Sequence, residues 1–149
     1  MLFRGTRQEP ARRSPDEKGH SLRGLAARCG SRHAGGDGRL VIGAAERGAR
    51  GVGIDIDPSL VLRSRENASA AGQSERTEFR TGNFFDADLT GATVVALYLL
   101  HSVNAKLLPK LRRELPPGTR LVSHSFDMGD WPAQQRITVE EKWIFLWVV

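Results

Sequence analysis

A glycine-rich turn, followed by a strand that ends in an acid, constrains this sequence most. The turn is Gly-Gly-Asp-Gly at 35–38, and the strand lies within Val52-Gly-Ile-Asp-Ile-Asp-Pro58, with Asp55 19 positions after Gly36. At about 20 residues, an acid can reach the ribose of a nucleotide seated on such a turn. Glycine lets the backbone approach a ligand and adopt positive φ, and the start of a helix offers free N–H groups.

Taken alone, this pattern leaves three readings open. It is found in dinucleotide enzymes and in S-adenosylmethionine enzymes, and it also occurs as a tight strand-to-helix turn that binds nothing. The nicotinamide reading is the weaker of the first two because the extended Gly-x-Gly-x-x-Gly run is absent: Leu40 and Val41 follow the turn where that run continues.

Composition and cysteine content narrow the class of protein. The 149 residues are 40% hydrophobic and 26% charged, which is ordinary for one soluble domain. No stretch approaches the roughly 20 apolar residues of a membrane span, so we expect no membrane partner. Cys29 is the single cysteine, which excludes an internal disulfide and favours a reducing, cytoplasmic compartment. No His, Cys and acid cluster has metal-ligand spacing, so no metal site is expected.

The positive charge is confined to the start of the chain. Residues 1–34 contain 8 Lys and Arg and 3 Asp and Glu, whereas residues 35–149 contain 14 of each. We therefore expect a basic, disordered leader over 1–34 and a globular domain over 35–149. Because the domain carries no net charge, the composition predicts no nucleic-acid partner.

Hydrophobic periodicity predicts strands that alternate with helices. The predicted helices cover 37–47, 58–71 with Asp57 as N-cap, and a segment from an Asn104 cap to 115. The predicted strands cover 51–56, 77–81, 93–99, 121–125, and a final antiparallel hairpin of 137–139 and 143–149. This order indicates an α/β sheet with an antiparallel edge.

Five segments in this order resemble class I S-adenosylmethionine-dependent methyltransferases. They are Gly36-Asp-Gly-Arg39, Gly51-Val-Gly-Ile-Asp-Ile-Asp-Pro58, Gly82-Asn-Phe-Phe-Asp86, Leu97-Tyr-Leu-Leu100 and Asp127-Met-Gly-Asp-Trp131. The likeness covers 35–149 and is to small bacterial enzymes, which in turn resemble mitochondrial protein-lysine methyltransferases. It implies a Rossmann-like, seven-stranded sheet whose last strand pair is antiparallel. It also implies S-adenosyl-L-methionine as a cofactor that lies across the carboxyl ends of the first four strands.

The resemblance also implies site residues on the loops that follow the strands. Six would contact the cofactor: Gly36, Gly38, Asp55, Ile56, Asn83 and Phe84. The glycines would approach its methionine part, Asp55 would hold the ribose hydroxyls, and the other three would lie beside the adenine.

Tyr98 is the predicted catalytic residue, because it would face the methyl group and the substrate. A lysine acceptor must lose a proton before it reacts, and the other candidates to assist are His101, His124 and Asp127. Each of these four also has a plain structural explanation, as a packed or solvated side chain. Trp131 could wall a substrate channel or cap the core.

The sequence departs from this family before the glycine turn. Family members place an apolar first strand there, ending in an acid and a glycine, where this chain has Arg32 and Ala34. Residues 28–32 cannot form a buried central strand. Losing three or four buried aliphatic side chains at about 1.5–3 kcal/mol each removes about 5–10 kcal/mol, comparable to the stability of a whole domain. The hypothesis is that 1–34 are not the ancestral start of the fold, and that the first strand is missing or replaced.

Two functions follow from the resemblance. The first is S-adenosylmethionine-dependent methyl transfer to a protein lysine or another amine, with a protein or small molecule as acceptor. The alternative is a catalytically impaired remnant that binds cofactor weakly or not at all, which the altered first strand favours.

Overall fold

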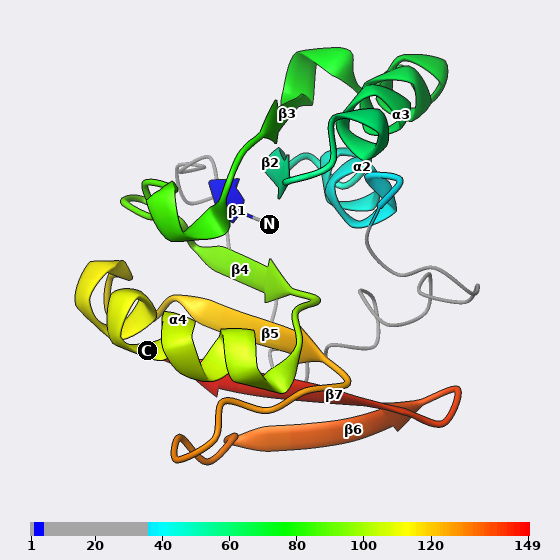
Figure 1. Cartoon of the computed structure of the whole chain (residues 1–149). Helices are drawn as coiled ribbons and strands as arrows, with labels where there is room; N and C mark the ends of the chain where they lie inside the picture. Colours follow the sequence, from blue (N-terminus) through cyan, green and yellow to red (C-terminus); the bar gives the residue numbers. More distant parts are fainter. Residues whose placement is uncertain (1, 5–35) are drawn as a thin grey trace, which may run out of the picture.

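The structure, a computed structural model, describes residues 2–4 and 36–149 (Figure 1). Their strands form one seven-stranded sheet in the order β3-β2-β1-β4-β5-β7-β6. The strands are β1 (Leu2–Arg4), β2 (Arg50–Asp55), β3 (Thr77–Thr81), β4 (Val94–Leu97), β5 (Arg120–His124), β6 (Gln135–Val139) and β7 (Lys142–Val148). The α-helices of the described residues are α2 (Arg39–Ala45), α3 (Pro58–Ala70) and α4 (His101–Glu114), and short 3-10 turns η1 (Ser74–Arg76) and η2 (Phe84–Asp86) flank β3.

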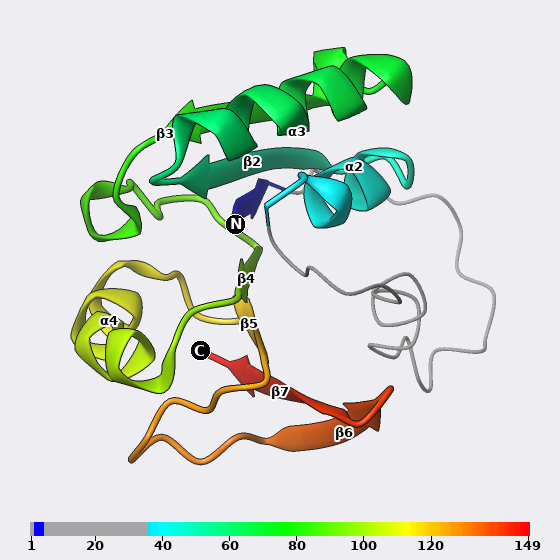
Figure 2. The ribbon, with the colours of Figure 1, turned by 45° about the vertical axis from the view of Figure 1, so that its right-hand side comes forward.

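Helices cover both faces of the sheet (Figure 2). On one face, α2 and α3 pack over β2 and β3 through a cluster that contains Val41, Val61 and Phe79. On the other face, α4 packs over β4 and β5 through a larger cluster built around Leu107, Leu111 and Trp147. This arrangement confirms the predicted α/β sheet with an antiparallel carboxyl-terminal hairpin.

Local sequence signals explain where α3 and the hairpin form. The Asp57 carboxylate accepts a hydrogen bond of 2.8 Å from the Ser59 N–H, and Pro58 occupies the first helical position, as N-terminal preferences predict. The β6–β7 hairpin turns through Glu140 and Glu141, both at positive φ, which is the backbone conformation of a two-residue type I′ turn. Both features confirm the sequence predictions.

The start of α4 differs from the prediction. The helix begins at His101 rather than after an Asn104 cap, and Asn104 lies inside it, completely buried. Its side-chain amide donates to Ser123 Oγ and to the Asp127 carbonyl rather than serving the helix N-terminus. The N-cap prediction was wrong because a buried tertiary partner is available to this amide.

Strand β1, formed by residues 2–4, lies between β2 and β4 in the sheet. Strand β1 runs antiparallel to both neighbours, with Leu2 opposite Val52 and Val95. Residues 2–4 belong to the predicted disordered leader, and their place in the sheet differs from that prediction. The physical reason is that the inner edges of β2 and β4 present backbone groups that need hydrogen-bond partners.

The segment 28–32, which the sequence excludes as a central strand, lies outside the described residues. The division into 1–34 and 35–149 stays a prediction. Within the described residues, no helix has the length and apolar character needed to cross a bilayer.

Candidate functional site

The glycine turn is held in one conformation by packing beneath it. Gly38 has a φ of 76°, and a Cβ there would lie 2.8 Å from the Phe79 ring and 2.9 Å from Ser64 Cβ. At Gly36, a Cβ would lie 2.8 Å from the Leu60 side chain. Glycine is therefore required at 38 by both its backbone angle and its contacts.

Polar contacts fix the same turn from its sides. Arg39 Nε donates to the Asp37 carboxylate at 2.9 Å, and this hydrogen bond holds the pKa of Asp37 below its ordinary value. The Asn67 amide of α3 donates to the Asp37 carbonyl at 3.0 Å. The turn is thereby joined to α3 and presents a rigid backbone.

Asp55 lies at the carboxyl end of β2, beside the glycine turn. Gly38, Gly53 and Asp55 line one small cavity of about 20 Å³. Asp55 Oδ1 accepts the Asp57 N–H at 2.9 Å, whereas Oδ2 has no hydrogen-bond partner among residues 2–4 and 36–149. The structure therefore brings the Asp55 carboxylate and Gly38 together, with one oxygen of the carboxylate available, and the cavity between them has room for about one water molecule.

The three residues predicted to lie beside the adenine differ in exposure and in hydrogen bonding. Ile56 is 77% exposed directly after Asp55, which leaves an apolar surface for a ring. Asn83 Oδ1 accepts the Phe85 N–H at 3.0 Å and closes η2, while its amide N–H groups remain available in the described part of the chain. Phe84 is buried in the core, so its ring is not exposed at the site. The cofactor-binding roles of all six residues stay predictions.

Tyr98 and His124 meet where β4 and β5 end. The Tyr98 side chain is half exposed, and its ring centroid lies 4.9 Å from that of His124, at 63°. His124 Nδ1 lies 2.9 Å from Ser125 Oγ. Ser125 is not among the predicted site residues, because its backbone angle, φ 68°, leaves no signal in the sequence.

The other polar candidates lie on the loop after β5 and at the start of α4. His101 Nδ1 contacts Asp127 Oδ1 at 2.9 Å, with both side chains largely exposed. The Trp131 ring packs 6.0 Å from the Trp147 ring, and the Trp147 indole donates to the Trp131 carbonyl. These contacts place Trp131 at the boundary of the core. Capping the core is one of the two roles predicted for it.

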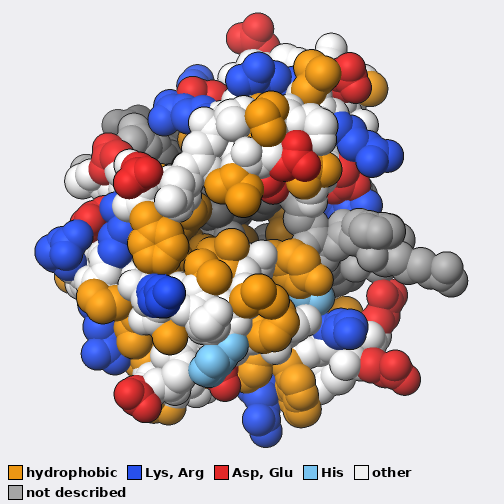
Figure 3. All heavy atoms as spheres, in the orientation of Figure 1, with side chains coloured by type: hydrophobic (Ala, Val, Ile, Leu, Met, Phe, Trp, Pro, Cys, Tyr) orange, Lys and Arg blue, Asp and Glu red, His pale blue; other side chains and the backbone are white. Residues whose placement is uncertain are grey.

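Exposed apolar side chains gather around this edge of the sheet. Ile56, Tyr98 and Leu100 are each at least half exposed although they are large and apolar. Figure 3 shows hydrophobic side chains around a hollow in the middle of the face in view. The exposed Ile56 next to the Asp55 carboxylate suits a ligand with apolar and polar parts.

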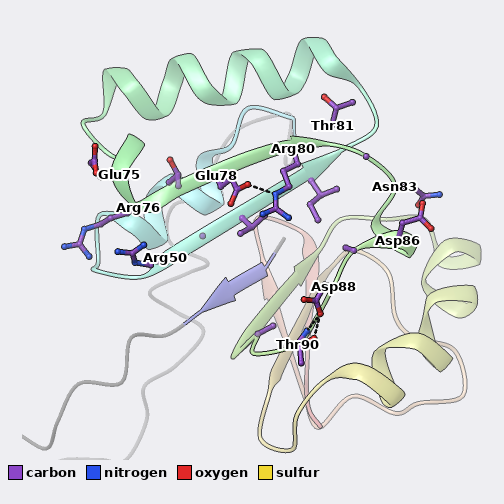
Figure 4. Close-up of a pocket in the computed structure, with 17 residues that line it drawn as sticks. Arg50, Glu75, Arg76, Glu78, Arg80, Thr81, Asn83, Asp86, Asp88 and Thr90 are labelled. Carbon is purple, nitrogen blue, oxygen red and sulfur yellow. Dashed lines mark hydrogen bonds and ion pairs between the residues drawn. The ribbon is translucent and has the colours of Figure 1, made fainter.

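A second depression lies on the face of β2 and β3 that α2 and α3 leave uncovered (Figure 4). It has a volume of about 860 Å³, and Arg50, Glu78 and Arg80 line it with residues of the loop after β3. Glu78 and Arg80, two residues apart on β3, form an ion pair in its lining. Within the described residues, no group of three or more His, Cys, Asp and Glu is arranged to hold a metal.

Comparison with known proteins gives the family. A family model described as the ANTKMT methyltransferase domain matches residues 34–135. A protein-lysine N-methyltransferase of Saccharolobus islandicus is 41% identical over 108 residues, which are 71% of this chain and 67% of that protein. The adenine nucleotide translocase lysine N-methyltransferase of Mus musculus is 35% identical over 97 residues, 64% of this chain and 42% of that protein.

A solved structure shares the fold of this chain. The RNA methyltransferase from Salinibacter ruber, in complex with S-adenosyl-L-homocysteine, superposes with a TM-score of 0.73 and 53% identity. The match covers 76% of this chain and 74% of that one.

The fold and the site define a class I S-adenosylmethionine-dependent methyltransferase. Within that class, the chain belongs to the ANTKMT methyltransferase domain family. The predicted cofactor, S-adenosyl-L-methionine, is thereby confirmed. The residues present fit it, because Asp55 offers an unpaired carboxylate oxygen beside the glycine turn and Ile56 offers an apolar surface next to it. The chain spans about two thirds of the Saccharolobus relative and less than half of the mouse one.

Proposed function

We propose that this protein transfers a methyl group from S-adenosyl-L-methionine to the side-chain amine of a protein lysine. The observation that carries the proposal is that Gly38 and Asp55 lie together at the carboxyl edge of the sheet, the edge at which the exposed Tyr98 follows β4. The lysine acceptor is supported by two relatives whose names specify lysine N-methylation.

The chain's own residues bind and align the reactants. When bound, the cofactor supplies a methyl group on a sulfonium, which an amine displaces directly while the sulfur leaves as a thioether. Asp55 accepts hydrogen bonds from the ribose hydroxyls, and Ile56 covers the adenine. The amide of Asn83 hydrogen-bonds the adenine edge. Tyr98 borders the acceptor side, so the main contributions are alignment and exclusion of water.

RNA is the second acceptor to consider, because the Salinibacter structure carries that name. The charge distribution favours protein over RNA. Residues 35–149 carry 14 basic and 14 acidic side chains, and RNA binding generally depends on an excess of basic side chains that contact phosphates. We therefore propose that the domain has no nucleic-acid partner. We also propose a cytoplasmic location, on the single cysteine Cys29.

Calorimetry tests the cofactor site. S-adenosylmethionine and S-adenosylhomocysteine should bind and NAD should not. Asp55→Ala should weaken binding by about 10- to 100-fold, because a hydrogen bond to a charged group contributes roughly 1.5–3 kcal/mol. Asp55→Asn keeps an acceptor for the Asp57 N–H and separates folding from binding, and Glu66→Gln, an exposed acid of α3, should change nothing. Binding of no ligand would contradict the proposal and favour the impaired remnant, whereas binding of NAD alone would contradict the proposed S-adenosylmethionine site.

A labelled-methyl assay tests the acceptor. The substrates are a peptide library with one fixed lysine, the same library with arginine in its place, total cell protein, and total RNA. Label on lysine-bearing substrates that the arginine library does not take up supports the proposal. Label on RNA alone assigns the acceptor to nucleic acid and overturns it.

A further inference from the structure

His124 stands at the end of β5 with one ring nitrogen engaged and the other open. Nδ1 lies 2.9 Å from Ser125 Oγ, whereas Nε2 has no hydrogen-bond partner within residues 2–4 and 36–149. The Tyr98 ring packs edge-on against the imidazole. Nε2 is not among the buried side-chain atoms that lack a hydrogen-bond partner, so a bound molecule can reach it.

Ser125 adopts a backbone conformation that a serine rarely takes. Its φ is 68°, and the left-handed region raises the free energy of a non-glycine residue. The other non-glycine residues described at positive φ, Glu140 and Glu141, form the hairpin turn, which requires that conformation. Ser125 is in no hairpin turn. A 2.7 Å hydrogen bond from its N–H to the Trp143 carbonyl of β7 holds it in place.

We propose that His124 is the general base that removes a proton from the acceptor amine, and that Ser125 is a positioning residue that orients its ring. The inference rests on the proposed lysine methylation. His124 Nδ1–H donates to Ser125 Oγ, which leaves the Nε2 lone pair directed at the acceptor. Nε2 takes one proton from R–NH3⁺ to give R–NH2 and an imidazolium. The nitrogen lone pair then forms the N–CH3 bond as the C–S bond breaks, and the imidazolium returns its proton to water.

The charge state of His124 suits this task. Burial, and the positive charge of Lys142 on β7, lower its pKa from the ordinary value of 6.5, so the imidazole is neutral near pH 7. The titratable groups that face it among the described residues are Tyr98, after β4, and Lys142. His101 Nδ1 contacts Asp127, and both side chains are largely exposed, whereas His124 is partly buried beside Tyr98.

The acceptor itself also favours a base here. A free lysine ammonium has a pKa of about 10.4, so it is unreactive near neutrality. Beside a cationic sulfonium and out of water, like charge and desolvation lower that pKa. A neutral imidazole in contact with the amine then provides the route by which the proton leaves.

NMR of the isotope-labelled protein tests the geometry without any activity. Long-range proton–nitrogen correlations identify which nitrogen of each histidine carries the proton, and His124→Gln assigns the His124 signals by their loss. We expect the neutral ring to be the Nδ1–H tautomer, and Ser125→Gly to mix the two tautomers. A dominant Nε2–H tautomer in the unsubstituted protein would overturn the proposal.

The pH profile of His124→Gln tests the chemistry. We expect kcat near pH 7 to fall by about 100-fold or more, with KM and the affinity for S-adenosylhomocysteine within about threefold, and the deficit to shrink towards pH 10 as solvent deprotonates the amine. Lys142→Gln should move the acidic limb to higher pH, because it removes a charge that lowers the His124 pKa.

The outcomes separate this inference from the proposed function. If the unsubstituted protein methylates lysine but the His124→Gln deficit is the same at every pH, the general-base role is wrong and the function stands. If the unsubstituted protein methylates RNA and no lysine, the proposed function is wrong, and the base has no ammonium on which to act.

Discussion

At the residue scale, Gly38 meets a conformational and a packing requirement together. Its φ of 76° lies in the left-handed region, and Phe79 and Ser64 occupy the space where a Cβ would project. Gly48 has a similar φ of 88°, but no atom lies within 4 Å of its Cβ position. Gly38 and Gly48 therefore have the same kind of backbone conformation, but only Gly38 is closely packed at its Cβ position.

We expect Gly38→Ala to lower the free energy of unfolding by about 2–5 kcal/mol. Roughly 1–2 kcal/mol comes from the left-handed backbone and about 1–3 kcal/mol from overpacking against Phe79 and Ser64. Gly48→Ala should show the backbone part alone. Urea denaturation measures both variants, and equal losses would mean that the contacts beneath the turn do not constrain it.

At the element scale, Asn104 joins α4 to the loop after β5. Its side chain is fully buried. Its amide donates to the Asp127 carbonyl at 3.1 Å and to Ser123 Oγ at 3.2 Å. Its Oδ1 has no hydrogen-bond partner among the described residues. The loop that carries Asp127 and Trp131 is therefore positioned by a helix whose N-cap, Leu100, lies four residues before the predicted cap.

Asn104→Ala should lower the free energy of unfolding by about 1–3 kcal/mol, because it leaves buried acceptors without donors. Asn67→Ala is the matched control. Asn67 makes the same kind of amide-to-carbonyl bond, 3.0 Å to Asp37, but at an exposed position, where water can replace it. Chemical denaturation should find a clearly smaller loss for Asn67→Ala, and a larger loss there would reverse the assignment.

At the scale of the whole molecule, strand β1 connects two parts of the sheet. Strands β3 and β2 lie on one side of it, and β4, β5, β7 and β6 lie on the other. The register pairs Phe3 with Gly51 and Val94. Residues 2–4 thus form the strand that joins β2 to β4 in the middle of the sheet.

Deletion of residues 1–4 should speed hydrogen exchange in β2 and β4, because their backbone groups lose the pairing with β1. Exchange in the β6–β7 hairpin, which β1 does not contact in the strand order, should change little and serves as the internal control. Unchanged protection in β2 and β4 would show that this pairing contributes nothing to the sheet.

Much of the fold could be predicted because its signals are local. The strand over 77–81 has the predicted bounds, and α3 begins where Asp57 and Pro58 indicated. Strand β4 is shorter than predicted and ends at Leu97, so Tyr98 lies on the loop at the edge of the sheet. Of the candidate site, the meeting of Gly38 and Asp55 was predictable, since the strand that ends in Asp55 and the glycine turn share one edge of an α/β sheet.

The sequence alone determined the α/β class, the glycine turn, the acid at 55 and the family likeness, because each depends on neighbouring residues and on hydrophobic period. Tertiary structure decided the rest. The antiparallel β1, the burial of Asn104 and the left-handed Ser125 each depend on partners far along the chain, namely Val95, Asp127 and Trp143. Such pairings are set by competition for hydrogen bonds in the folded molecule, and no local pattern records them.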